Sequence, residues 1–378
     1  MAPETLPLEL EEEILIRVPA LSLVRFRIVC KQWNALFNNK RFVNNHLARP
    51  SPEFIITTKS KLYYVSVNLD NDPDIPGLET RKNSMVHHCD GLLLCTRDNG
   101  ATVWNPWLSQ TRLIESKTQL YSFVYGLGYD SSGPEKNYKI VGIVYVQQRW
   151  RVGIYQFATS EWKYIDACFE EKPMKILGHP YSNVSLNGNL YWIANDDTTR
   201  EYFIQSFDCS KEMFRRFCIL PCQGRYLDNH ALAVFKGDRF SLLEQCDRTR
   251  RIQIWVTENK VDDSGDVVWI KLMTVSTPSC PMLSKVSSPS YFVDSSIYGK
   301  SLVICCIDEC LQACIFIARE DLCRKIKLKS VVGQFFHSLC VSSLIPIPWE
   351  SSDQENKKGL GCLKGGYWEM KFKEFLKF

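Results

Sequence analysis

The stretch IYQFATSEWKYI, Ile154 to Ile165, joins an apolar run with one aromatic residue, a polar turn and a second apolar run. Short runs of this kind, separated by turn signals, are typical of β-strands. Four other stretches repeat the pattern, and the aromatic residues of the five lie 51, 52, 48 and 61 positions apart. They are VWNPWLSQTRLI (Val103 to Ile114), QSFDCSKEMFRRF (Gln205 to Phe217), QIWVTENK (Gln253 to Lys260) and CIFIARED (Cys314 to Asp321).

A repeat of about 50 residues with several strands per unit indicates a β-propeller rather than a helical solenoid. The repeated aromatic residues are Trp104, Tyr155, Phe207, Trp255 and Phe316. FIITTKSKLYYVSV, Phe54 to Val67, would begin an earlier unit, so we expect a kelch-like β-propeller of about six blades. SLCVSSLIPI, Ser338 to Ile347, could supply the strand that closes the ring and hides the sheet edges. A two-sheet β-sandwich is the alternative.

Two hairpins are expected at Asn99-Gly100 and Asn187-Gly188, each of which separates two apolar runs. Asn-Gly favours a type I′ turn because both central residues of that turn need positive φ.

The first 48 residues contain no glycine, and their apolar residues recur at helical spacing. Pro7 suits the first turn of a helix, the following glutamates suit its N-terminal dipole, and Pro19 would end it. Ser22 is the expected N-cap of a second helix that carries Leu23, Phe26 and Ile28. A third helix would follow around Trp33, and a fourth over residues 42–47.

The expected domains are a helical module over 1–48, a linker over 49–53 that contains Pro50 and Pro52, a β domain over 54–348 and a tail over 349–378. The tail begins with SSDQENKKGLGCLKGG, a composition typical of flexible linkers. It ends with YWEMKFKEFLKF, which could be an amphipathic docking peptide or a loosely packed strand.

The helical module contains more apolar residues than helices of this length can bury among themselves. The excess would pack on the β domain or on another protein, and a stable interface between proteins buries about 1,200–2,000 Å². The proline-bounded first helix and the linker favour another protein.

Residues Leu6 to Leu47 resemble an F-box, a resemblance carried by Leu6-Pro7, Ile14-Leu15, Pro19, Ser22-Leu23 and VCKQW (Val29 to Trp33). The β region resembles the plant F-box-associated domain. The matching stretches are HCDGLLL (88–94), WNPWLSQTR (104–112), YGLGYD (125–130), NYKIVGI (137–143), VSLNGNLYWI (184–193), IWVTEN (254–259) and SLIPI (343–347).

The resemblance implies the substrate-recognition subunit of an SCF-type cullin–RING ubiquitin ligase, in the nucleus and/or cytoplasm. The F-box would dock on a Skp-type adaptor and through it on cullin, and the β domain would hold the protein to be ubiquitinated. Because propeller loops usually carry recognition, the turn QQRW (Gln147 to Trp150), Trp107 and Tyr181 are candidates for exposed aromatic contacts, with ordinary packing as the alternative. By motif position, the adaptor-binding residues would be Leu6, Pro7, Leu10, Ile14, Leu15, Val18, Pro19, Leu23, Val29, Cys30, Lys31 and Trp33.

We expect no catalytic residues, cofactor or metal. The chain lacks HExxH and Gly-x-Ser-x-Gly, and GLGYD (126–130) lacks the context of a nucleotide-binding loop. His87-His88-Cys89-Asp90 has no second ligand pair at metal-binding spacing, and the paired aspartates lie in turn-like segments. The 16 cysteines include no Cys-x-x-Cys pair and fit buried, reduced thiols.

The net charge of +4 and the pI near 8.2 are too mild to indicate nucleic-acid binding. The alternatives are nonetheless a nucleic-acid-binding regulator with a basic helical module, or a scaffold outside any ligase. We expect no membrane association, because no signal peptide or membrane-length apolar run is visible.

Overall fold

The computed structural model describes the helical module and most strands of the β domain. The described residues are 6–48, 52–58, 61–65, 77–79, 86–97, 100–116, 123–146, 149–166, 168–169, 172–173, 183–196, 198–199, 201–221, 229–276, 282–283, 288–294, 300–308, 310, 312–319, 322–328, 331 and 335–348. The predicted tail, 349–378, therefore lies outside the described residues.

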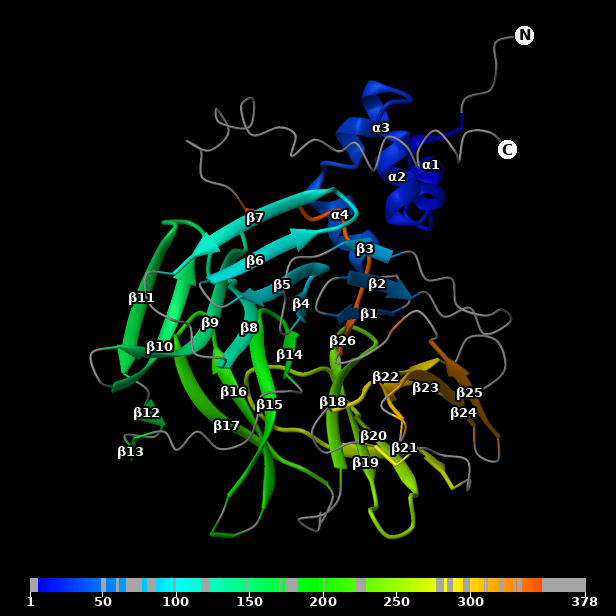
Figure 1. Ribbon diagram of the computed structural model, residues 1–378. Coiled ribbons are helices and arrows are strands. Elements are labelled where there is room, and N and C mark those ends of the chain that lie inside the picture. Colours follow the sequence, from blue (N-terminus) through cyan, green and yellow to red (C-terminus); the bar gives the residue numbers. More distant parts are fainter. Residues whose placement is uncertain are drawn as a thin grey trace.

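Four short helices form the N-terminal module (Figure 1): α1 (Leu8–Leu15), α2 (Ala20–Phe26), α3 (Lys31–Leu36) and α4 (Lys40–Leu47). Pro7 and Pro19 immediately precede α1 and α2, each with extended ψ, so each helix begins at the next residue. The prediction of Ser22 as an N-cap is therefore wrong: Ser22 lies inside α2, and its N–H donates to the Pro19 carbonyl at 2.9 Å.

Side chains cap the other two helices. The Cys30 Sγ accepts a hydrogen bond from the Trp33 N–H at 3.4 Å, and the Asn39 Oδ1 accepts from the N–H groups of Arg41 and Phe42 at 2.9 and 3.4 Å. These bonds satisfy N–H groups that have no partner within their own helix.

The described strands form six four-stranded antiparallel sheets and one two-stranded hairpin. The first three sheets are β26 (Phe335–Cys340), β1 (Glu53–Thr58), β2 (Lys61–Val65), β3 (Gly77–Glu79); β4 (Val86–Cys89), β5 (Leu92–Arg97), β6 (Gly100–Asn105), β7 (Gln110–Glu115); and β8 (Phe123–Asp130), β9 (Asn137–Val146), β10 (Arg149–Gln156), β11 (Glu161–Asp166). The hairpin is β12 (Cys168–Phe169) and β13 (Lys172–Pro173).

The other three sheets follow in chain order. They are β14 (Asn183–Leu186), β15 (Asn189–Asn195), β16 (Tyr202–Asp208), β17 (Met213–Ile219); β18 (Asn229–Phe235), β19 (Arg239–Gln245), β20 (Ile252–Thr257), β21 (Trp269–Val275); and β22 (Ser290–Asp294), β23 (Ser301–Ile307), β24 (Ala313–Ala318), β25 (Cys323–Lys327).

The inner strands of the sheets form a closed ring (Figure 1). β26, β4, β8, β14, β18 and β22 contact one another in this order, and β22 contacts β26 again. The ring closes because β26, from the end of the described chain, pairs antiparallel with β1, with Phe54 opposite Leu339. This arrangement is a β-propeller, as predicted, and the two-sheet sandwich is wrong.

The aromatic repeat seen in the sequence has a simple structural meaning. Its five residues, Trp104, Tyr155, Phe207, Trp255 and Phe316, lie on β6, β10, β16, β20 and β24, which are the third strands of their sheets. Tyr155 pairs with Trp162 and Phe207 with Phe214 on the neighbouring fourth strand. The repeat therefore marks one equivalent strand in each of five sheets.

The turn prediction at Asn187-Gly188 is confirmed, since both residues have positive φ, 52° and 85°, between β14 and β15. The hairpin predicted at Asn99-Gly100 is confirmed by the pairing of β5 with β6, although Asn99 itself lies outside the described residues. Asp90 and Gly91 have φ of 52° and 79° between β4 and β5 and form a further turn of this kind that we did not predict.

The segment after β26, residues 341–348, packs against the β4–β7 sheet. The buried Asn105 side chain donates to the carbonyls of Ser343 and Ile345 at 3.3 and 2.7 Å, and Arg112 donates to the Pro348 carbonyl at 2.5 Å. Ile345 and Ile347 belong to the same apolar core as residues of α4. The described chain therefore ends beside the helical module.

Candidate functional site

The helical module has an internal core that accounts for about half of its apolar side chains. Leu15, Leu23, Phe37 and Phe42 are almost completely buried. A row of rings stabilises this core: Phe26 contacts Trp33, Trp33 contacts Phe37, and Phe37 contacts Phe42, with centroid separations of 5.6, 6.4 and 5.4 Å. The interior of the helical module is therefore filled by the module's own side chains.

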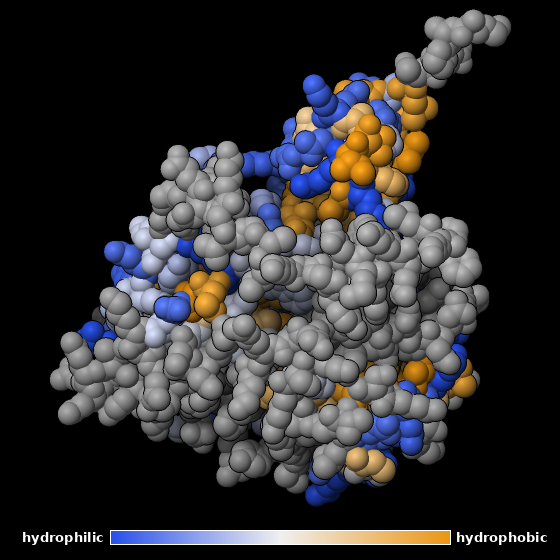
Figure 2. Space-filling view, turned by 45° about the horizontal axis from the view of Figure 1, so that its top comes forward, coloured by the Kyte–Doolittle hydropathy of each residue, from blue (hydrophilic) through white to orange (hydrophobic). Residues whose placement is uncertain are grey.

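Helix α1 leaves a different set of apolar residues in contact with water. Leu6, Leu10 and Ile14 are 51%, 53% and 56% exposed. Leu10 and Ile14 lie at four-residue spacing on one side of α1, and Leu6 lies two residues before the helix begins. We call these three residues the α1 face. Figure 2 shows hydrophobic residues gathered at the surface of the helical module.

The connection between α2 and α3 exposes a second apolar group. Ile28 is 92% exposed and Val29 is 61% exposed, and Cys30 after them is exposed as well. α2 ends at Phe26, and the Val29 N–H donates back to the Phe26 carbonyl at 3.0 Å, so the chain turns here and its side chains point outward.

Trp33 links α3 to α1. Its indole N–H donates to the Glu11 carboxylate, and its ring packs between Phe26 and Phe37. The side chain is only partly buried, so Trp33 both supports the core and contributes to the module's surface.

Helix α4 fastens the module to the propeller. Figure 1 shows α4 between the other helices and the sheets, and its Phe42 and Val43 share a core with Trp107 of the β6–β7 turn. The Lys40 Nζ also pairs with the Glu135 carboxylate in the β8–β9 turn at 2.5 Å. This contact does not cover the α1 face, since its three residues stay about half exposed.

His46 of α4 ties the helices together. Its Nε2 lies 2.9 Å from the Val18 carbonyl, and burial lowers the pKa of its imidazole more than this hydrogen bond raises it. A neutral His46 is therefore favoured, which suits a buried position in the module.

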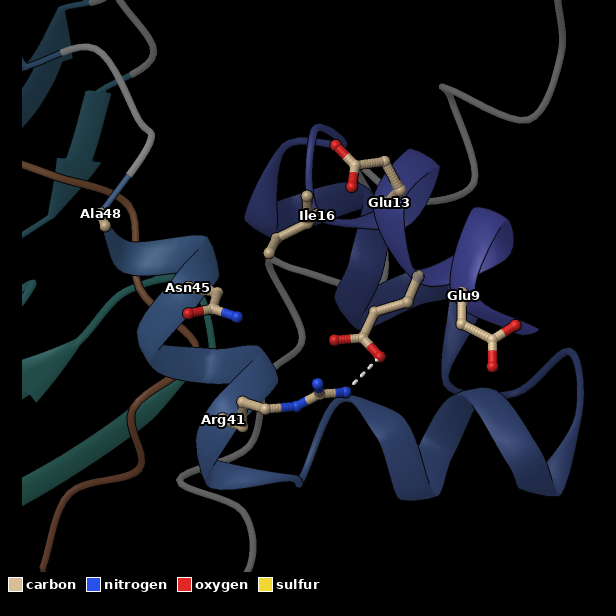
Figure 3. Close-up of a pocket in the computed structure, with 7 residues that line it drawn as sticks. Glu9, Glu13, Ile16, Arg41, Asn45 and Ala48 are labelled. Atoms are coloured by element: carbon tan, nitrogen blue, oxygen red, sulfur yellow. Dashed lines mark hydrogen bonds and ion pairs between the residues drawn. The ribbon is translucent and has the colours of Figure 1, made fainter. Parts of the chain in front are cut away.

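A pocket lies between α1 and α4 (Figure 3). It is lined by Glu9, Glu12, Glu13, Ile16, Arg41, Asn45 and Ala48. Glu12 pairs with Arg41 at 2.7 Å across it, and Glu13 pairs with Arg17 at 2.5 Å on its own helix. The pocket gives the side of α1 that faces α4 an acidic character.

Two family models match this chain, one over the helical module and one over the propeller. The F-box domain model matches residues 4–45, and the F-box associated beta propeller domain model matches residues 53–347. The chain is a plant F-box protein with an F-box-associated domain.

The relatives are similar to this F-box protein over nearly their whole length. An Arabidopsis thaliana protein named for an F-box and kelch repeats is 45% identical over 369 residues, which cover 91% of this chain and 99% of the relative. The Arabidopsis Protein SUPPRESSOR OF NIM1 1 is 44% identical over 371 residues, covering 91% and 98%. A further Arabidopsis F-box protein is 43% identical over 377 residues, covering 93% and 99%.

The predicted adaptor-binding residues of the F-box divide into three groups by exposure. Eight are exposed: Leu6, Pro7, Leu10, Ile14, Pro19, Val29, Cys30 and Lys31. Val18 and Trp33 are half-buried, while Leu15 and Leu23 are 3% and 0% exposed in the core of the F-box. This burial favours internal packing for Leu15 and Leu23, and adaptor contact by the twelve residues stays a prediction.

The sequence reading missed three exposed apolar residues of the F-box. They are Leu8, Leu21 and Ile28. Ile28 was expected in a helix, but α2 ends before it. The sequence signal for the end of this helix was the adjacent pair Ile28-Val29, because β-branched residues lower helix propensity.

The histidine–cysteine stretch of the propeller is structural. His87 and Cys89 are buried on β4, where the His87 Nδ1 lies 2.7 Å from the Asn183 Oδ1 and the Ser185 hydroxyl donates to the Cys89 Sγ at 3.1 Å. Burial lowers the pKa of His87 to about 4 and raises that of the Cys89 thiol. Within the described residues no three His, Cys, Asp or Glu side chains are placed to hold a metal ion.

The acidic turn residues are also structural where the structure describes them. The Asp196 carboxylate accepts from the N–H groups of Thr198 and Thr199, and the Asp262 carboxylate accepts from the Ser264 N–H. Asp72, Asp74 and Asp197 lie outside the described residues. All cysteines whose burial the structure describes are free thiols.

The prediction of Trp107 as an exposed aromatic contact for the substrate is wrong, because Trp107 is 4% exposed in a core that it shares with Phe42 and Val43. The side chains of Trp150 and Tyr181 lie outside the described residues, so these two candidates stay predictions. No helix of the described chain combines the length and apolarity needed to cross a membrane.

Proposed function

We propose that this F-box protein is the substrate-recognition subunit of an SCF-type cullin–RING ubiquitin ligase. The F-box docks on a Skp-type adaptor, and the propeller holds the protein to be ubiquitinated. One observation carries the proposal: the α1 face stays open although the F-box has a buried core of its own and packs through α4 on the propeller. Membership of the F-box family supports it.

The energetics of the α1 face favour a protein partner. Burying one Leu or Ile side chain is worth about 1.5–3 kcal/mol, and three such side chains in a row form the kind of apolar centre on which affinity depends. Val29, Cys30 and Lys31 extend the proposed adaptor surface across the α2–α3 connection.

The propeller is proposed to position the substrate rather than to react with it. Its contribution to the rate of ubiquitin transfer would be proximity, because it holds the substrate near a catalytic subunit of the ligase. The seating of α4 against the β6–β7 and β8–β9 turns favours a fixed orientation between adaptor and substrate. We propose no catalytic residue and no cofactor in this chain.

The nucleic-acid alternative has less support in the F-box. Arg17 pairs with Glu13, Arg41 with Glu12 and Lys40 with Glu135, so three of the basic side chains already have acidic partners. The expected location in the nucleus and/or cytoplasm and the kelch-like character of the repeats remain proposals; the printed name of one relative supports the second.

Complex formation with purified components tests the proposed function. Full chain and a Skp-type adaptor should co-elute as one complex at about 50 mM and about 500 mM salt, since an apolar interface depends little on ionic strength. Strongly salt-dependent binding to DNA, without an adaptor complex, would favour the nucleic-acid alternative. An adaptor complex that supports no ubiquitination of captured partners would favour the scaffold alternative.

A further inference from the structure

The α1 face combines apolar residues with negative charge. Residues 6–19 contain four glutamates and one arginine, a net charge of −3. Glu9 and Glu13 neighbour Leu10 and Ile14 along α1, and Glu13 pairs with Arg17 at the surface, whereas Glu12 points to α4 and pairs with Arg41 (Figure 3). A ligand for this surface would therefore carry apolar side chains together with positive charge.

One segment of the chain itself has this chemistry. The sequence KGGYWEMKFKEFLKF, residues 364–378, contains four lysines and two glutamates, a net side-chain charge of +2. Its Trp368, Phe372, Phe375 and Leu376 lie at i, i+4, i+7 and i+8, the spacing of an apolar stripe on a helix. The segment lies beyond both family domains, the second of which ends at residue 347.

The described chain ends beside α4, in the core that joins the F-box to the propeller. Ile345 and Ile347 share a core with Phe42 and Val43 of α4, and Arg112 holds the carbonyl of Pro348. Residues 349–366 then separate this anchor from Tyr367. Eighteen residues of this composition span about 23 Å on average, and tethering over such a length gives an effective concentration in the millimolar range.

We propose that the C-terminal segment Tyr367–Phe378 docks on the α1 face within the same chain and competes there with the adaptor. The competition rests on the proposed function, whereas the docking does not. At an effective concentration of about 1 mM, a segment that binds with a Kd of about 100 µM would weaken adaptor binding about tenfold.

Zero-length carbodiimide cross-linking of the full chain tests the docking. Lys371, Lys373 and Lys377 should form cross-links to Glu9 or Glu13, and the cross-links should be lost in Phe372→Asp/Phe375→Asp. The Phe372→Leu/Phe375→Leu variant, which keeps the apolar stripe, should retain them. Ile14→Asp should also lose them, whereas Ile219→Asp, an exposed isoleucine of β17, should not. Absence of these cross-links overturns the docking.

A mixture of isotopically light and heavy chains identifies the occupant. Cross-links within one chain support the proposal, whereas cross-links only between light and heavy chains mean that a second copy covers the face and overturn it.

Adaptor affinity tests the competition separately. The Phe372→Asp/Phe375→Asp chain should bind a Skp-type adaptor about tenfold more tightly than the unchanged chain. Equal affinities, with the cross-links present, overturn the competition. A complete failure of both chains to bind the adaptor overturns the proposed function, while the cross-links still decide the docking.

Discussion

Substitution by Asp should have different effects at two neighbouring residues of α1, Ile14 and Leu15. Ile14 is 56% exposed and Leu15 is 3% exposed, although the two adjoin in sequence and are similarly apolar. Ile14→Asp changes a side chain that is largely in water, so the free energy of unfolding should change by less than about 0.5 kcal/mol. Leu15→Asp places a carboxylate in the F-box core and should cost more than about 4 kcal/mol.

The effect of Ile14→Asp on adaptor binding should be large. Ile14 is 56% exposed in the free chain, so its further burial in the interface is worth about half of the 1.5–3 kcal/mol of a fully buried side chain, and an unpaired carboxylate in an apolar interface adds a desolvation cost. A total of about 3 kcal/mol corresponds to roughly 100-fold weaker binding.

Isothermal titration of a Skp-type adaptor into each variant measures this, with circular dichroism as the check on folding. Ile219→Asp is the matched control, because Ile219 is 55% exposed and lies on the outer strand β17. Our reasoning is refuted if Ile14→Asp binds with undiminished affinity, or if Ile219→Asp weakens binding equally.

Three further predictions concern the propeller and its closing segment. Gly91→Ala should destabilise the chain by at least about 2 kcal/mol more than Gly237→Ala. The two glycines have similar φ, 79° and 81°, but only at Gly91 would an added Cβ lie 2.1 Å from the Ser343 Cβ. Equal losses of unfolding free energy in urea would contradict this prediction. Asn105→Ala should lower the free energy of unfolding by about 3 kcal/mol, because the Asn105 side chain is buried and makes four hydrogen bonds. Asn38→Ala, at an exposed position, should lower it by less than about 0.5 kcal/mol in the same measurement. Burial holds the pKa of His87 at about 4, below its unfolded value of about 6.5, so its stabilising contribution is fully present above pH 6.5 and is lost as the pH falls towards 4. Urea unfolding should lose about 2 kcal/mol from this residue between pH 7.5 and pH 5, and His87→Asn should flatten the dependence; an unchanged slope would argue against it.

The parts of the fold that could be predicted from sequence are those set by local chemistry. The aromatic repeat of about 50 residues marked equivalent strands because each sheet places its third strand in the same environment. Asn187-Gly188 could be assigned because few other pairs tolerate positive φ at both turn positions.

The exposure of individual apolar residues could not be predicted, because it depends on contacts between segments far apart in sequence. Ile14 and Leu15 are about 100° apart on a helix, and only the packing of α2, α3 and α4 against α1 decides which one is covered. Trp107 was a candidate for a surface aromatic residue, but it is buried in a core that includes Phe42, which lies more than 60 residues away in the sequence. Such contacts leave no local signal.

Hydrogen–deuterium exchange of the full chain with and without a purified Skp-type adaptor tests the central claim most directly. The account predicts slower exchange over Leu8–Leu15 and Ile28–Leu36 in the complex, with unchanged exchange in the inner strands of the propeller. Protection of propeller strands, with α1 exchanging as fast as in the free chain, would contradict it.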